Sequence, residues 1–167
     1  LIEDNEELMS YETKSNLVNS IKLTGTTNSG LSIGIINSIT EKAYANVKDL
    51  NTQEIKNKLI APLTNYNVVS LSQTALNKYS TFSFLNTNVN RGDDFKGSNN
   101  SALVVDLYDN DRKFNINANV FQSNSKSFSD TKGFRGGISL SELTGSFSFD
   151  ICCNGVDSVS FTQIRSY

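Results

Sequence analysis

The residue types that most often carry out chemistry in proteins are scarce in this sequence. Histidine is absent from all 167 residues, so a histidine-based triad, metal ligand or general base is impossible within the chain. The only cysteines are the neighbours Cys152 and Cys153, and adjacent cysteines rarely bridge each other without strain. We expect two free thiols near a strand end, with a metal or redox role as the alternative.

Carboxylates cluster at two places. Asp106, Asp109 and Asp111 surround a short turn, which offers too little chain to wrap a calcium ion with several oxygen ligands. Aspartate also favours tight turns for its own hydrogen bonds, so we expect structural turn residues here. Asp93 and Asp94 lack a partner acid at the separation that glycoside hydrolysis needs. We therefore predict no catalytic, cofactor-binding or metal-binding residue, no cofactor and no enzymatic activity.

Three aromatic residues lie in or beside long polar stretches: Tyr44, Tyr66 and Phe95. Such rings can stack on sugars, which would make a glycan a partner of the chain. The alternative is that each ring packs its own loop against the protein.

The elements that must position these residues alternate with a period of two, which is typical of β-strands. The clearest segment is Lys113–Gln122, where apolar and polar side chains alternate almost without a break. The apolar positions expected on one side of the strands are Leu31, Ile33, Ile35, Phe82, Phe84, Leu103, Val105, Leu107, Phe114, Ile116, Val120, Phe147 and Phe149. The polar positions expected on the other side are Asp106, Lys113, Asn115, Asn117, Asn119, Ser146, Ser148 and Asp150.

The connections between these strands alternate in length. Short turns rich in Gly, Asn or Asp are expected at Thr26–Gly30, Thr74–Lys78, Asp109–Arg112 and Glu142–Gly145. Long polar stretches are expected at 41–65, 87–100 and 123–135, the first with one helical turn over Asp49–Ile60. The pattern predicts eight antiparallel strands in four up-and-down hairpins. Brief turns at one end and long loops at the other are typical of outer-membrane β-barrels.

The composition favours a sheet with one apolar and one uncharged polar face. Hydrophobic residues make up 37% and charged residues 19%, whereas Asn and Ser number 22 and 23. A wet lumen suits such a polar face, so we interpret the apolar positions as lipid-facing and the polar ones as lumen-facing. A soluble β-sandwich also alternates and stays open as an alternative. A net charge of −2 gives no support for nucleic acid as a partner.

Several blocks resemble one protein family. They are IKLTGTTNSGLSIGIINSIT at Ile21–Thr40, EKAYANV at Glu41–Val47, PLTNYNVVSL at Pro62–Leu71 and SFLNTNVNR at Ser83–Arg91. Together these spacings resemble the DUF5916 family over about residues 17–149. The resemblance implies a long protein of the Bacteroidota, with a large outer-membrane-like barrel that often follows a carbohydrate-binding, family-9-like module. It also implies that further strands of a longer barrel lie outside this chain.

These observations predict three regions: an acidic linker or loop at 1–16, a barrel segment at 17–152, and a tail at 153–167 that departs from the family pattern. The expected function is non-enzymatic, as part of a barrel in the bacterial outer membrane that handles glycans or nutrients at the cell surface. The alternative is a secreted or surface-bound β-sandwich that binds carbohydrate.

Overall fold

The chain is all-β. The computed structural model describes residues 3, 5–11, 15–126, 130–143, 148–156 and 160–165, with the side chains at 126, 130–131, 148, 150–156 and 160–165 left out. Its strands are β1 (Glu6–Tyr11), β2 (Leu17–Thr26), β3 (Leu31–Thr40), β4 (Ala43–Asp49), β5 (Ile55–Ala61), β6 (Thr64–Thr74), β7 (Thr81–Arg91), β8 (Ser98–Tyr108), β9 (Phe114–Lys126), β10 (Asp130–Glu142), β11 (Ser148–Val156) and β12 (Ser160–Arg165).

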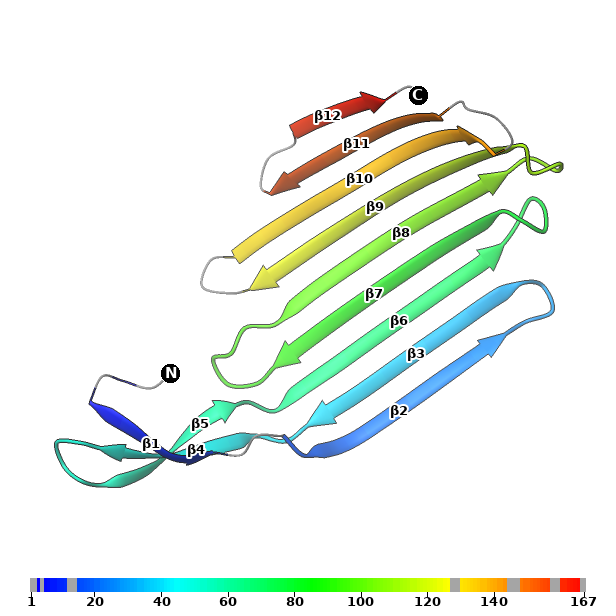
Figure 1. The fold of residues 1–167 in the computed structure, drawn as a ribbon. Helices are drawn as coiled ribbons and strands as arrows, with labels where there is room; N and C mark the ends of the chain where they lie inside the picture. Colours follow the sequence, from blue (N-terminus) through cyan, green and yellow to red (C-terminus); the bar gives the residue numbers. More distant parts are fainter. Residues whose placement is uncertain are drawn as a thin grey trace.

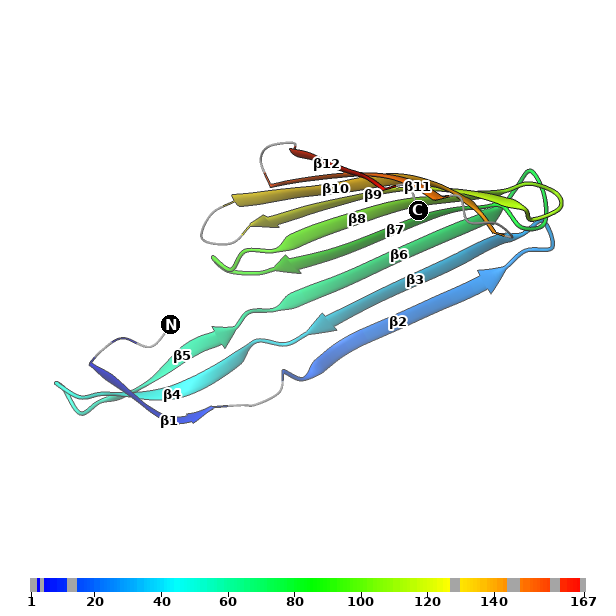
Figure 2. The ribbon, with the colours of Figure 1, turned by 45° about the horizontal axis from the view of Figure 1, so that its top comes forward.

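Nine strands form one antiparallel sheet in the order β12-β11-β10-β9-β8-β7-β6-β3-β2 (Figure 1). Each strand in this main sheet pairs with its neighbour along the chain, except where β4 and β5 intervene between β3 and β6. The sheet curves as a single layer (Figure 2). Strands β2 and β12 are its two edges, so the sheet is open in the part of the chain that the structure describes.

The eight strands expected from the two-residue period are confirmed as β2, β3 and β6–β11. They also pair as predicted, in the hairpins β2–β3, β6–β7, β8–β9 and β10–β11. The predicted alternation of short and long connections is wrong for two of the three expected long loops. Strand β7 continues to Arg91 and β9 to Lys126, so the connections that follow them are no longer than the turn between β6 and β7. Among the described residues there is no helix long and apolar enough to cross a membrane.

The short turns hold the residues that tight turns require. Gly30 has a φ of +84°, and a Cβ there would meet the Cβ of Thr74 at 3.1 Å. Asp109 accepts a hydrogen bond from the Phe114 N–H at 2.9 Å, and this bond lowers the pKa of its carboxyl group. Asp109 is therefore a turn residue, as its sequence context predicts.

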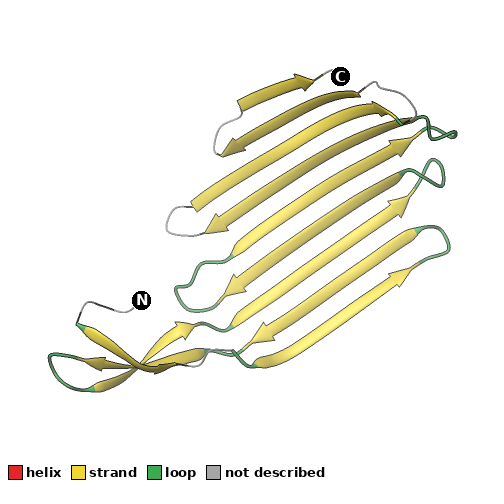
Figure 3. Cartoon of the chain, viewed as in Figure 1, coloured by secondary structure: helices red, strands yellow, loops and turns green. Residues whose placement is uncertain are grey.

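A second, three-stranded sheet with the order β1-β4-β5 corrects two predictions (Figure 3). Strand β1 lies inside the segment 1–16, which the sequence predicts as a linker or loop. Strands β4 and β5 fill the expected long loop at 41–65, and the segment predicted to form a helical turn is a hairpin. In the described part of the chain, the buried hydrophobic core consists of Ala43, Ala45 and Val47, which all lie on β4 and are each at most 2% exposed.

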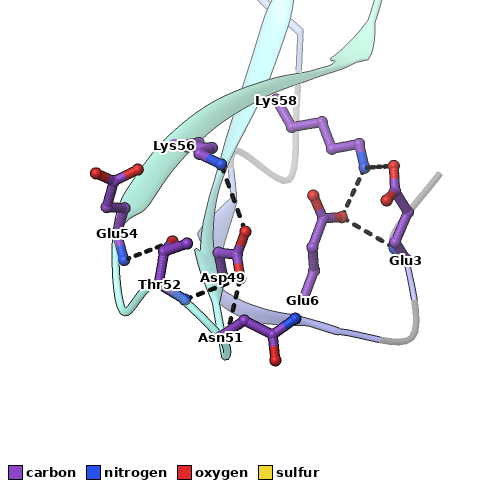
Figure 4. A network of polar contacts seen from close by, with 8 residues as sticks. All are labelled: Glu3, Glu6, Asp49, Asn51, Thr52, Glu54, Lys56 and Lys58. Carbon is purple, nitrogen blue, oxygen red and sulfur yellow. Dashed lines mark hydrogen bonds and ion pairs between the residues drawn. The ribbon is translucent and has the colours of Figure 1, made fainter.

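Ion pairs and turn hydrogen bonds hold the ends of this small sheet (Figure 4). The Lys58 ammonium group lies 2.6 Å from the carboxylate of Glu6, which joins β5 to β1. The carboxylate of Asp49 accepts hydrogen bonds from the backbone N–H groups of Asn51 and Thr52 at 2.9 and 3.2 Å. The hydrogen bond from Lys58 lowers the pKa of Glu6, and those two N–H groups lower the pKa of Asp49.

We expect the small sheet to open before the main sheet on acidification. A carboxyl group whose pKa is lowered by folding stabilises the folded state above its unfolded pKa and loses that contribution as pH falls through the folded value. Here the loss begins below about pH 4.5. Protection factors, which correct for the intrinsic slowing of amide exchange in acid, should therefore fall in β4 and β5 between about pH 5 and pH 3, with those of β7 and β8 unchanged. A Glu6→Gln variant should lose part of this pH dependence, and an equal fall in both sheets would contradict the prediction.

The C-terminal region also differs from expectation. Strand β11 continues four residues past position 152 and β12 pairs with it, so residues 153–156 and 160–165 extend the main sheet. The predicted boundary between barrel segment and tail is therefore not a boundary of the fold.

Candidate functional site

The register of the main sheet sorts its side chains into two faces, because directly paired residues of an antiparallel sheet point to the same side. One face carries an apolar band in the half near the short turns. The band consists of Leu23, Leu31, Ile33, Ile35, Val69, Leu71, Phe82, Phe84, Leu103, Val105, Leu107, Phe114, Ile116, Ala118, Val120, Ile138, Leu140 and Phe149. All the expected apolar positions fall in it except Phe147, which lies outside the described residues.

The apolar band is open to its surroundings. Leu103, Phe114 and Ile138 are 48%, 47% and 47% exposed, and most of the other large side chains in the band are exposed or half-buried. The second sheet of a β-sandwich would bury such residues. The soluble sandwich that the sequence leaves open is therefore not formed by the described residues.

The opposite face carries hydrogen-bonded polar side chains beside the band. The Asn119 amide donates to the Asn117 side-chain oxygen at 2.9 Å, and Asn117 donates to Asp106 at 2.7 Å. Asn115 shares this face and donates to the Leu107 carbonyl oxygen at 3.3 Å. The backbone register puts positions 148 and 150 opposite Ser141 and Ser139, on the same face.

Two of the expected polar positions stand apart. Lys113 lies in the turn before β9 and pairs with Asp111 at 3.6 Å, so it belongs to the turn rather than to a strand face. Ser146 lies outside the described residues. The opposite face is more apolar at the end of the strands away from the short turns. There Ile36 pairs with Val68, and Ala102 pairs with both Leu85 and Phe121.

A row of five asparagines crosses the face of the main sheet that carries the apolar band, which we call the band face. The row lies beyond the band, towards the ends of the strands away from the short turns. Asn37, Asn67, Asn88, Asn99 and Asn124 pair in this order across β3, β6, β7, β8 and β9. Each stands four residues along its strand from the apolar row Ile33, Leu71, Phe84, Leu103 and Val120. We call this set the asparagine row. The band face is thus divided into an apolar zone near the turns and an amide zone near the loops.

The asparagine row is partly satisfied within the chain. The Asn37 amide donates to the side-chain oxygens of Asn65 and Asn67, both at 2.7 Å. The side-chain oxygen of Asn99 accepts from Asn86 at 3.2 Å. In the described part of the chain, the side-chain amides of Asn88 and Asn124 make no hydrogen bond, although both residues are half-buried.

We expect Asn37→Ala to cost about 1–3 kcal/mol, because it removes two half-buried hydrogen bonds and leaves two acceptors without their donor. Denaturant unfolding, in the solvent or detergent in which the chain folds, measures this change in the free energy of unfolding. Asn19→Ala on the exposed edge strand β2 is the matched control, with an expected change within about 0.5 kcal/mol. Equal losses for the two variants would contradict a structural role for the Asn37 amide.

A hollow of about 490 Å³ lies where the asparagine row meets the connection between β7 and β8. Asn88, Asn99 and Asn124 line it from the strands, and Asp93, Asp94 and Phe95 line it from the loop. Asp93 also pairs with Lys42 at 2.9 Å, and this hydrogen bond raises the pKa of Lys42. Of the three aromatic residues considered for sugar contact, this hollow contains Phe95 and neither Tyr44 nor Tyr66.

A family model covers nearly the whole chain. The model described as "Domain of unknown function (DUF5916)" matches residues 1–160. The chain belongs to the DUF5916 family. The resemblance seen in the sequence blocks is thereby confirmed, and the DUF5916 match extends past position 149 into the segment predicted to depart from the family. No curated protein and no solved structure matches this DUF5916 chain.

The functional features of this DUF5916 chain were only partly predictable. The two faces near the turns follow from the two-residue period. The asparagine row was missed, because it appears only when strands far apart in the sequence are aligned by register. A signal was present, since each of its asparagines follows or precedes an apolar band residue by four positions.

Proposed function

We propose that this chain forms part of the wall of an outer-membrane β-barrel, with the apolar band against lipid and the opposite face towards a lumen. The observation that carries the proposal is the uncovered band, which continues from β2 to β11 on one face of a single-layer sheet. In water such a surface would favour association. In lipid it needs no second layer, and paired strands satisfy their own backbone groups.

The strand lengths support this proposal. Strands β2, β3 and β6–β10 contain between 10 and 13 residues. A tilted spanning strand needs about 9–11 residues, so each can cross a bilayer and project beyond it. The connection between β3 and β6, which contains β4 and β5, is much longer than the turns at the other end of the sheet. The longer connections of such barrels lie outside the cell, so this orientation puts the small sheet and the hollow on the external side.

Closure of the barrel requires more strands than the described residues provide next to β2 and β12. An open sheet edge does not persist in the hydrocarbon region, because its N–H and C=O groups would lack partners. We therefore propose that strands from the rest of a longer chain, or from another copy, pair with these edges. The proposed role is non-enzymatic, in glycan or nutrient handling at the cell surface.

The test is to express the chain and examine it with and without detergent. We expect it to require detergent or lipid for folding, and to migrate differently on a gel before and after heating, as folded barrels do. Protein that is folded and monodisperse without detergent would end the membrane proposal.

A further inference from the structure

We infer that the asparagine row and its hollow bind the uncharged, hydroxyl-rich head group of a glycolipid in the outer leaflet. This inference rests on the proposed membrane function and specifies a lipid partner for the band face. It is carried by three features of the same surface: the depth of the row, the unpaired amides in the hollow, and an apolar groove on the adjoining strands.

The asparagine row lies beyond the apolar positions of its own strands, on the side of the external connections. Four residues separate Val120 from Asn124, and the same spacing separates Leu103 from Asn99. At about 3.3 Å per residue this is about 13 Å along the strand. A spanning strand needs about 9–11 residues, so a span of β9 that begins at Phe114 ends at about positions 122–124. In the proposed orientation Asn99 and Asn124 therefore lie where the hydrocarbon meets the lipid head groups.

The chemistry of the hollow favours a neutral polyol over a phosphate. Each side-chain amide offers donors and an acceptor, which suits hydroxyl groups that both donate and accept. The amides of Asn88 and Asn124 face this space without a hydrogen-bond partner among the described residues. The lining includes the carboxylates Asp93 and Asp94 as well as Arg91 and Lys96, and Asp93 pairs with Lys42 beside it. Two carboxylates next to the amides disfavour a phosphate, which binds best where cations alone surround it.

Phe95 adds an apolar surface to this polar lining. It is half-buried in the loop that borders the hollow, next to the carboxylates of Asp93 and Asp94. A sugar ring has one face of C–H groups and a rim of hydroxyls, so an aromatic ring beside polar side chains is complementary to it. The lining thus provides contacts for both parts of a sugar.

An apolar groove of about 290 Å³ lies on the strands that also carry Asn99 and Asn124. Leu103, Val105, Val120 and Phe134 line it, together with the small residues Ala118 and Gly136. The groove is part of the apolar band, at hydrocarbon depth in the proposed orientation. An acyl chain in the groove would place its head group towards the asparagine row along β8 and β9, which favours a lipid over a free sugar.

The experiment compares folding and retention of the full chain in two kinds of vesicle. One is pure phosphatidylcholine, and the other contains digalactosyl diacylglycerol in phosphatidylcholine. We expect the glycolipid to raise the equilibrium constant for binding of the chain to the vesicles about fivefold to tenfold. This is the effect of one or two net hydrogen bonds. The double variant N88A/N124A should bind both vesicles equally. Asn100→Ala, on the opposite face beside Asn99, should keep the preference.

The outcomes distinguish this inference from the proposed membrane function on which it rests. Equal binding of the unaltered chain to both vesicles overturns the head-group inference and leaves the membrane proposal intact. A preference for vesicles of anionic phosphatidylglycerol over the glycolipid also overturns it, because charge would then be the selected property. Failure to insert into any vesicle overturns both.

Discussion

An arginine in place of Ile116 should destabilise the membrane-folded chain by about 2–4 kcal/mol. Ile116 lies in the apolar band of β9, with Leu107 and Leu140 as its direct neighbours on β8 and β10. In the proposed orientation the new guanidinium group would face the hydrocarbon, where a charged side chain is strongly unfavourable. Urea unfolding in lipid vesicles, followed by heat-dependent gel migration, measures the change.

Asn117→Arg is the matched control because it alters the next residue of the same strand. Its side chain points to the opposite face, where Asp106 lies 2.7 Å from the amide of Asn117 and could pair with the arginine. We expect a change of less than about 1 kcal/mol for this variant. Similar losses for both substitutions would show that the two faces do not differ in environment, and the lipid-facing assignment of the band would be wrong.

A lysine in place of Val47 should open the small sheet with a loss of about 3 kcal/mol or more. Val47 is 2% exposed on the central strand β4, between Leu8 of β1 and Lys56 of β5. A lysine there would bury its ammonium group beside another cation. Among the described strands, none of the small sheet pairs with one of the main sheet, so the damage should stay local. Hydrogen exchange should quicken in β1, β4 and β5, with protection in β6–β9 retained.

Asn46→Lys provides the comparison for this prediction. Asn46 is exposed on the other side of β4, where its amide donates to Ser10 at 2.9 Å. Losing that surface hydrogen bond should cost about 1 kcal/mol or less. Loss of protection throughout the chain in Val47→Lys would contradict the separation of the two sheets.

The main sheet could be predicted from the sequence because apolar and polar side chains alternate strongly along its strands and few of them are buried. Phe114 to Val120 show the period without interruption, and the turns between hairpins carry Gly, Asn or Asp. The small sheet could not be predicted in the same way. Its central strand buries Ala43, Ala45 and Val47, two of which are too small to give a clear hydrophobic period. The intervening Tyr44 and Asn46 made the segment resemble a polar loop.

The candidate site depended on information that a period of two does not contain. Alternation assigns a residue to a face, whereas the asparagine row requires knowing which residue of one strand stands opposite which residue of the next. Apolar neighbours such as Ile35 and Ile36, or Val120 and Phe121, obscured even the face assignment. In the structure these pairs mark the level at which the band ends on one face and apolar residues begin on the other.

The same asparagine row has a consequence for how the strands find their partners during assembly. A strand that slides by two residues keeps every side chain on its proper side, so simple alternation cannot reject that error. With the row present, such a slip between β7 and β8 would set Asn88 against Ser101 or against Gly97, so Asn88 would no longer stand opposite Asn99 in the row. The row therefore favours the correct strand register over registers that are shifted by two residues.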